Sequence, residues 1–105
     1  MMHRVYISGG MSDYTEEEIK ERFGKAEADL KFYTRYYYKP IKVYNPAKWR
    51  WFLRYLPYKV ALVFDLLMLC RCDTILMLKN WTASNGATIE HKFAKSVGIK
   101  VEYEQ

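Results

Sequence analysis

The sequence has little cysteine and no long apolar run. Its soft metal ligands number four: Cys70, Cys72, His3 and His91. They offer no obvious set for a four-ligand zinc site, so we expect no metal and reduced, partly buried thiols. The apolar stretch from Val60 to Cys70 is interrupted by Asp65 and falls short of the roughly 20 residues that span a bilayer. We therefore predict a buried helix there and no membrane association.

The sequence also shows no pattern typical of a secretory signal. The chain begins Met1-Met2-His3-Arg4 and continues directly into a short apolar segment, without the apolar region of a secretory signal. We therefore expect a cytoplasmic protein. Its 105 residues suffice for one hydrophobic core and are too few for two, so we predict a single domain over residues 1–105.

The charge balance is basic, with a formal net charge of +5, and suggests an anionic partner. Basic residues interleave with aromatic ones in one region: Lys39, Lys42, Lys48, Arg50 and Arg54 with Tyr36, Tyr37, Tyr38, Trp49 and Trp51. Such a mixture can contact phosphates and stack bases. It equally suits a solvated basic rim around a small-molecule site. We favour the rim over nucleic-acid binding, because no RNP motif or zinc-finger spacing is present.

The order of local patterns predicts the fold. Short β-branched and aromatic segments predict strands at residues 4–8, 41–46, 73–78 and 100–103. Helical spacing or capping signals predict helices from Thr15 into residues 32–40, over 58–72, and over 84–97, which ends at Gly98. Residues 47–58 fit either a short helix or an irregular aromatic loop.

This alternation is typical of a flavodoxin-like or Rossmann-like three-layer α/β fold. We expect about four parallel strands in the order 2-1-3-4, with helices on both faces of the sheet. Ligands in such folds bind beyond the carboxyl ends of the strands, where the strand order reverses. The loops that would meet there are SGGMSDY, residues 8–14, and NWTASNG, residues 80–86.

Glu90 is the candidate functional residue of the last helix. It lies too deep for a capping box if Ser84 is the N-cap. Its neighbours three and four positions away are Gly86, Ala87, Phe93 and Ala94. Because none of them is basic, no local ion pair explains the carboxylate. The small residues suggest close approach of a ligand or another backbone, and a solvated surface glutamate is the alternative.

Several short motifs, taken in chain order, resemble those of a known family. They are Val5-Tyr6-Ile7-Ser8-Gly9-Gly10-Met11, Val43-Tyr44-Asn45-Pro46-Ala47, Asp65, Cys72-Asp73, Trp81, Ser84, Gly86-Ala87, Glu90 and Ala94. With these motifs the chain resembles the small phage and bacterial DUF4406 proteins, which are similar to the nucleoside 2-deoxyribosyltransferase superfamily. The resemblance covers nearly the whole chain.

The resemblance implies cofactor-free chemistry at an N-glycosidic bond. Glu90 matches the nucleophile that attacks the sugar C1′, and Asp65 matches an aspartate that acts near the base as proton donor or hydrogen-bond partner. The same division of roles operates in retaining glycoside hydrolysis. We expect burial to raise the pKa of Asp65, and we expect Glu90 to stay ionised beside polar loop groups.

The resemblance also narrows the substrate. Ser84 stands where nucleoside-acting relatives have aspartate and where deoxynucleoside 5′-monophosphate N-glycosidases have serine. A serine at a helix N-terminus suits a phosphate, and Ser8, Gly9 and Gly10 are candidates to complete an anion pocket. Gly86 belongs to the same motif. Tyr6 and Trp81 are further candidates for substrate binding, with core packing as the alternative.

Three readings of the function remain open at this stage. The first is a deoxyribosyltransferase or nucleotide N-glycosidase acting on a nucleotide or nucleoside. The second is a non-catalytic nucleotide-binding protein of the same fold, and the third is a basic nucleic-acid-binding module.

The chain is shorter than the characterised transferases, and its tyrosine cluster, Tyr36 to Tyr38, suits packing or a subunit contact. We therefore expect a homo-oligomer, a dimer or higher. The segments that close over the substrate in the longer relatives are either missing here or supplied by a partner subunit. Asp73 is expected to begin the third strand rather than to take part in chemistry.

Overall fold

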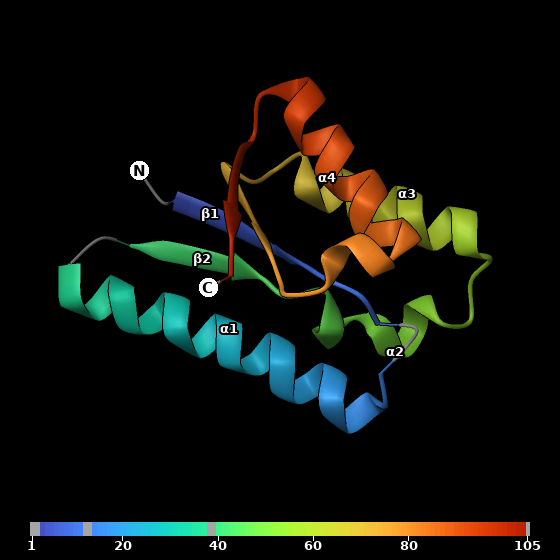
Figure 1. Cartoon of the computed structure of the whole chain (residues 1–105), viewed down its shortest axis with the longest axis horizontal. Helices are drawn as coiled ribbons and strands as arrows, with labels where there is room; N and C mark the ends of the chain where they lie inside the picture. The colour runs from blue at the N-terminus through green and yellow to red at the C-terminus, as the bar shows by residue number, and fades with distance from the viewer. Residues whose placement is uncertain (1–2, 12–13, 38–39, 105) are drawn as a thin grey trace.

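Four parallel strands form one sheet in this computed structural model (Figure 1). The structure describes residues 3–11, 14–37 and 40–104, apart from the side chains of residues 33–37 and 51. The strands are β1 (His3–Ser8), β2 (Ile41–Tyr44), β3 (Thr74–Met77) and β4 (Lys100–Tyr103). They lie in the order β2-β1-β3-β4 with every neighbouring pair parallel, which confirms the predicted order.

Helices connect the strands. The main ones are α1 (Glu16–Tyr37), α3 (Tyr58–Leu69) and α4 (Asn85–Val97). The segment that the sequence left open contains a 3₁₀ turn, η1 (Pro46–Lys48), and one turn of helix, α2 (Arg50–Leu53). A second 3₁₀ turn, η2 (Trp81–Ala83), precedes α4. The predicted alternation of strands and helices is therefore confirmed.

Helix α1 covers one face of the sheet. It begins with a capping box, in which the Thr15 N–H donates to Glu18 Oε1 at 2.9 Å and the Glu18 N–H donates to Thr15 Oγ1 at 3.2 Å. The buried core on this face joins helix and strand residues: Ile19, Phe23 and Ala26 with Ile7 and Leu78. The helical spacing of the α1 residues and the two-residue period of the strands bring these side chains together.

Helices α3 and α4 cover the other face. Its buried core contains the strand residues Tyr6, Ile75 and Met77, which alternate with those facing α1, together with Leu69, Ala87 and Ala94 from the helices. Helices on both sides of a central parallel sheet give the predicted three-layer arrangement. Figure 1 shows α1 on one side of the strands and α4 with α3 on the other.

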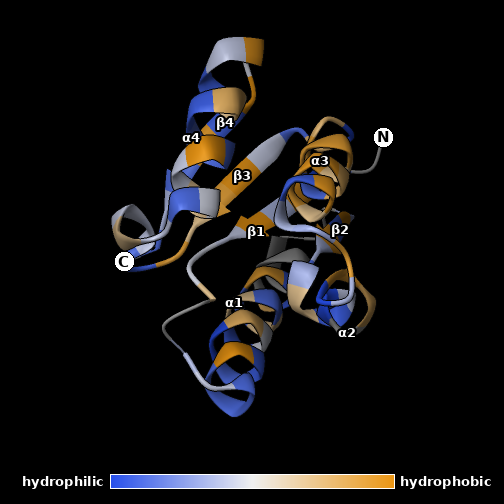
Figure 2. Ribbon diagram, turned by 90° about the vertical axis from the view of Figure 1, so that its right-hand side faces the viewer, coloured by the Kyte–Doolittle hydropathy of each residue, from blue (hydrophilic) through white to orange (hydrophobic). Residues whose placement is uncertain are grey.

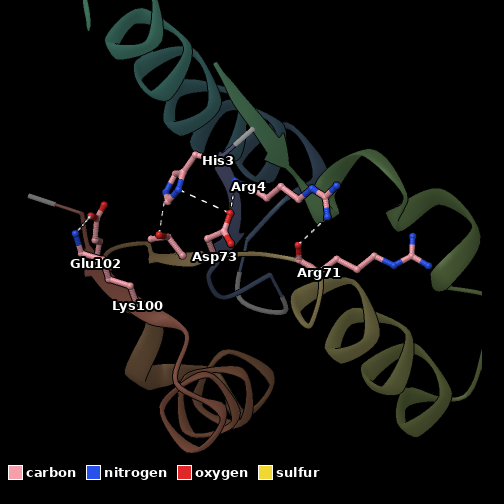
Figure 3. Close-up of polar contacts among 7 residues, drawn as sticks. His3, Arg4, Arg71, Asp73, Lys100 and Glu102 are labelled. Carbon is pink, nitrogen blue, oxygen red and sulfur yellow. Dashed lines mark hydrogen bonds and ion pairs between the residues drawn. The ribbon is translucent and has the colours of Figure 1, made fainter. Parts of the chain in front are cut away.

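A polar network lies where β1 and β3 begin (Figure 3). Asp73 Oδ2 accepts a hydrogen bond from the Arg4 N–H at 3.0 Å and lies 3.8 Å from His3 Nδ1. His3 Nε2 lies 3.0 Å from Thr74 Oγ1. These contacts join the starts of two neighbouring strands at the edge opposite to the carboxyl ends. They agree with the structural role predicted for Asp73.

Helix α3 departs from the expected buried helix. Leu69 is its one fully buried residue, whereas Val60, Val63 and Leu67 are exposed. One side of the helix packs on the sheet and α4, and no described part of the chain covers the other. The periodicity of the sequence does not distinguish the buried side of α3 from its exposed side, because the helix has apolar residues on every side. Among the helices that the structure describes, none has the length and apolar character needed to cross a membrane.

Candidate active site

A pocket of about 590 Å³ opens at the carboxyl ends of β1 and β3, where the strand order reverses and ligands bind in such folds. Four parts of the chain line it. They are the end of β1 with its loop (Tyr6, Gly9 and Met11), the segment between β2 and α3, the inner side of α3 with Asp65, and the beginning of α4 with Ser84, Gly86 and Glu90. The two predicted catalytic carboxylates therefore line the same pocket.

Glu90 is buried in the second turn of α4, with 6% of its surface exposed. Its Oε1 accepts a hydrogen bond from Ser8 Oγ at 2.8 Å. Its Oε2 is buried and has no hydrogen-bond partner among the described residues. Buried carboxylate oxygens are normally satisfied. One oxygen is thus fixed in position by Ser8, and the other has no hydrogen bond to a described residue, while Glu90 itself lines the pocket.

Tyr6 is the neighbour of Glu90 on β1. Its ring is fully buried, and its hydroxyl likewise has no partner among the described residues. Burial raises the pKa of Tyr6 well above its usual value, and the nearby Glu90 and Asp65 raise it further. The hydroxyl is close enough to influence Glu90, yet the two groups do not have the geometry of a formed hydrogen bond. Tyr6 therefore brings a protonated donor to the pocket.

The pKa of Glu90 is raised to about 7, chiefly by burial. Asp65 raises it further, whereas interactions with Tyr6 and Ser8 lower it. This differs from our expectation that Glu90 stays ionised. The polar groups at the start of α4 lie in the turn before Glu90, and the carboxylate itself points into a buried space. Loss of hydration therefore has the larger effect.

Asp65 provides a second carboxyl group of altered pKa. Burial raises its pKa to about 6, as expected, while the Trp49 indole opposes this rise by donating from Nε1 to Asp65 Oδ1 at 3.2 Å. Asp65 and Glu90 therefore both titrate near neutral pH. Two interacting carboxyls in this range can exchange a proton with a substrate.

The start of α4 forms a polar wall of the pocket. Ser84 is the N-cap, and its Oγ accepts a hydrogen bond from the Ala87 N–H at 3.2 Å. Gly86 also lines the pocket. Gly10 packs against Ser84, because a Cβ on Gly10 would come within 3.3 Å of Ser84 Cβ. The predicted meeting of the two loops at this helix is thus present.

Three predicted binding residues, Ser8, Gly10 and Trp81, do not line the pocket. Ser8 is fully buried, and its hydroxyl is committed to Glu90, so it positions the carboxylate rather than contributing to an anion pocket. Trp81 stacks on His91 with a centroid separation of 4.2 Å and packs on the core. An aromatic residue near a binding loop can pack inward or line the site, and the sequence does not distinguish these outcomes.

Arg22 on α1 holds the two site loops together. Its guanidinium donates from Nη1 to the Gly10 carbonyl at 3.3 Å and from Nη2 to the Lys79 carbonyl at 2.6 Å. It also lies over the Tyr14 ring, 4.0 Å from the centroid. These loops follow β1 and β3, so one side chain from the opposite face of the sheet fixes their spacing.

Arg50 and Arg54 line the pocket and were not among the predicted site residues. Arg50 is paired with Glu16, with Nε 3.0 Å from Oε1. Arg54 has no carboxylate partner among the described residues and lies near the Tyr55 ring. The basic and aromatic character of residues 47–58 was the available signal. That character suggests a basic rim around a small-molecule site, and the position of these two arginines at the pocket wall agrees with it.

Two further points concern possible metal ligands and the aromatic residues near the site. Among the described residues, no group of three or more histidine, cysteine, aspartate or glutamate side chains could hold a metal ion. The tyrosine cluster from Tyr36 to Tyr38, Lys39 and the Trp51 side chain lie outside the parts of the chain whose side chains the structure describes.

Comparison with known proteins identifies the family. The family model described as "Domain of unknown function (DUF4406)" matches residues 3–103, so its match extends from β1 through the pocket to β4. No curated protein and no solved structure matches the chain. The chain belongs to the DUF4406 family.

Proposed function

We propose that this protein cleaves or transfers at the N-glycosidic bond of a nucleotide or nucleoside. One observation carries the proposal: Glu90 is buried, is held by Ser8 through one oxygen, and has a second oxygen without a hydrogen-bond partner among the described residues, beside a pocket that Asp65 also lines. A nucleophile and a proton donor in one small-molecule pocket are the two groups that the reaction requires. The resemblance of the chain's motifs to those of the nucleoside 2-deoxyribosyltransferases supports the same reaction.

In the proposed mechanism, Glu90 Oε2 attacks C1′ of the sugar. A carboxylate-to-carbon bond forms while the C1′–N bond breaks, and the electron pair of that bond leaves with the base. Protonated Asp65 supplies the proton that the departing base requires. In hydrolysis, water then attacks C1′, the Glu90 carboxylate is released, and Asp65 takes the proton of the attacking water. Transfer follows if a second base replaces the water.

The proposed roles require one proton shared by two carboxyls. Glu90 must be ionised and Asp65 protonated, although the pKa of Glu90 is about 7 and that of Asp65 is about 6. The reactive arrangement is therefore a minor form of the singly protonated pair. That pair is most populated between the two pKa values, so kcat/KM should peak at a pH between about 6 and 7 and fall on both sides.

The charges around the pocket favour a substrate with an anionic group. Among the described residues Arg54, which lines the pocket, has no carboxylate partner, and the N-terminal turn of α4 contributes Ser84 and backbone N–H groups. The carboxylates Asp65 and Glu90 would repel an anion, so these basic and helix-terminal groups suit the phosphate end. We therefore favour a nucleoside 5′-monophosphate over a nucleoside, with Ser84 and Gly86 at the phosphate.

Release of free base tests this proposal. Purified protein would be incubated with nucleosides and nucleoside 5′-monophosphates of both sugars, and free bases would be measured by chromatography. We expect release by the wild type and its loss in Glu90→Gln, with at least about a 10²-fold decrease for a group that acts in the transition state. Asp65→Asn should also be slow, and the loss should be smaller for bases that leave without protonation.

Two controls make the result interpretable. Glu17→Gln changes an exposed glutamate of the first turn of α1 and should release base as the wild type does. Circular dichroism and thermal unfolding would establish that Glu90→Gln is folded. Release that persists in folded Glu90→Gln would contradict the proposed nucleophile. The absence of release from every panel member would overturn the enzymatic proposal in favour of a non-catalytic nucleotide-binding protein.

A further inference from the structure

The outer side of α3 is apolar and exposed. Val60, Val63 and Leu67 follow one another at intervals of three and four residues along the helix, and Cys70 continues the series after another three. Val60 is 50% exposed, Val63 55% and Leu67 61%, and Cys70 is exposed as well. We call these four residues the outer stripe. Figure 2 shows hydrophobic colouring along α3.

This spacing is that of a seam between two helices. Apolar residues that alternate at three and four positions stay on one side of a helix and insert between the side chains of a partner helix. A helix that is apolar all round is normally buried. The charged residues of α3 are Lys59 and Asp65, and Asp65 faces the pocket. The outer stripe therefore contains no charged residue to favour contact with water.

The total exposed surface also indicates a missing contact. A monomeric protein of 12.6 kDa has an accessible surface of about 6,200 Å² by the usual scaling with mass. The present chain exposes 7190 Å². Its radius of gyration, 13.1 Å, is close to the value of about 13 Å for a compact chain of this length. The excess is comparable to the roughly 800 Å² that each partner buries in a stable interface.

We propose that two copies of this chain associate through the outer stripes of their α3 helices, antiparallel about a two-fold axis. A second copy suits the surface because the stripe is uniformly apolar and small enough to pair with itself. The midpoint between Val60 and Leu67 lies beside Val63. An antiparallel pair therefore sets Val60 against Leu67 of the partner subunit and brings the two copies of Val63 together at the axis. Smaller and larger side chains then alternate across the seam.

The oligomeric state tests the proposal directly. Light scattering after gel filtration and sedimentation equilibrium, over a range of protein concentrations, should give twice the mass of one chain for the wild type. Val63→Lys and Leu67→Glu should each shift the protein to the monomer, because they place charges in the seam. Val97→Lys changes an equally exposed valine, 53% exposed at the end of α4, and should remain a dimer. Circular dichroism would establish that each variant is folded.

Disulfide crosslinking tests the direction of the helices. In a Cys70→Ser background, Val63→Cys should link two chains on oxidation, since residue 63 lies beside the axis. The native Cys70 residues would be about 20 Å apart along an antiparallel pair, too far for a disulfide. A disulfide between the native Cys70 residues would contradict the antiparallel arrangement.

Several outcomes would overturn the proposed dimer. One is a wild type that stays monomeric at every concentration, which would assign the stripe to a different protein. Another is a dimer that both stripe variants leave intact. These measurements involve no catalysis, so their outcome is independent of whether the protein releases a base.

Discussion

At the scale of single residues, Glu90 has a cost for folding. Its pKa in the folded protein is about 7, against 4.5 for an ordinary glutamate. The folded state therefore binds more protons than the unfolded state between these pH values, and the free energy of unfolding falls as pH rises through them. The difference corresponds to about 3 kcal/mol. A buried carboxylate that lowers stability in this way fits the catalytic role proposed for Glu90.

Replacement of Glu90 should reveal this cost. We expect Glu90→Gln to be more stable than the wild type at pH 8, by up to about 3 kcal/mol, and to differ little from it at pH 4.5. The amide can still accept a hydrogen bond from Ser8 and does not ionise. Urea unfolding at a series of pH values measures both quantities. Equal pH dependence in the two proteins would show that Glu90 is not desolvated in the folded state.

The sequence was sufficient to select Glu90 as a candidate functional residue, but it did not predict the raised pKa of its carboxyl group. The absence of a basic residue three or four positions away, together with the small neighbours Gly86 and Ala87, marked a carboxylate without a local partner. The pKa depends on burial beneath the pocket and on Asp65. These are distant in sequence, so no local pattern reports them. Asp65 was easier to interpret, because it interrupts an apolar helix.

At the scale of elements, Gly9 and Gly24 affect stability in opposite ways. A Cβ on Gly9 would lie 2.9 Å from Leu78 Cβ, where the loop after β1 passes the end of β3. Gly24 lies within α1 and has nothing within 4 Å of an added Cβ. The first position therefore requires glycine for close packing, whereas the second only weakens the helix.

Alanine substitutions distinguish the two positions. Gly9→Ala should destabilise the protein by about 1–3 kcal/mol, since the added methyl group meets a buried leucine. Gly24→Ala should stabilise it by about 0.5–1 kcal/mol, because alanine favours a helix. Chemical unfolding of both variants beside the wild type gives the comparison. Neutral behaviour of Gly9→Ala would contradict the close approach of the two loops.

The elements differ in how far the sequence predicts them. Alternation, apolar spacing and end signals predicted the four strands and α1, α3 and α4, because each element has either a clear period or clear ends. Residues 47–58 lack a sustained period, and their short turns bring Arg50 and Arg54 to the pocket only through the tertiary fold. In α3 the period was hidden, since apolar residues occupy every side. The sequence therefore predicted the helix and not its exposed face.

At the scale of the whole molecule, the proposed dimer makes stability depend on concentration. Association favours the folded state by mass action, so a tenfold increase in protein concentration contributes about 1.4 kcal/mol per dimer. For a dimer of this size, Tm should rise by about 3–5 °C. Differential scanning calorimetry at several concentrations measures the shift. Val63→Lys should abolish it, and a wild-type Tm that is independent of concentration would argue against coupled folding and association.

Helix α3 has two sides with different roles. Asp65 on its inner side lines the pocket and accepts a hydrogen bond from Trp49, while Val63 on its outer side lies beside the proposed two-fold axis. A displacement of α3 that accompanies substrate binding in one subunit would therefore move the helix against which the partner packs. In the proposed dimer, the two pockets would then respond cooperatively to a bound molecule, because each subunit would adjust the position of Asp65 in the other.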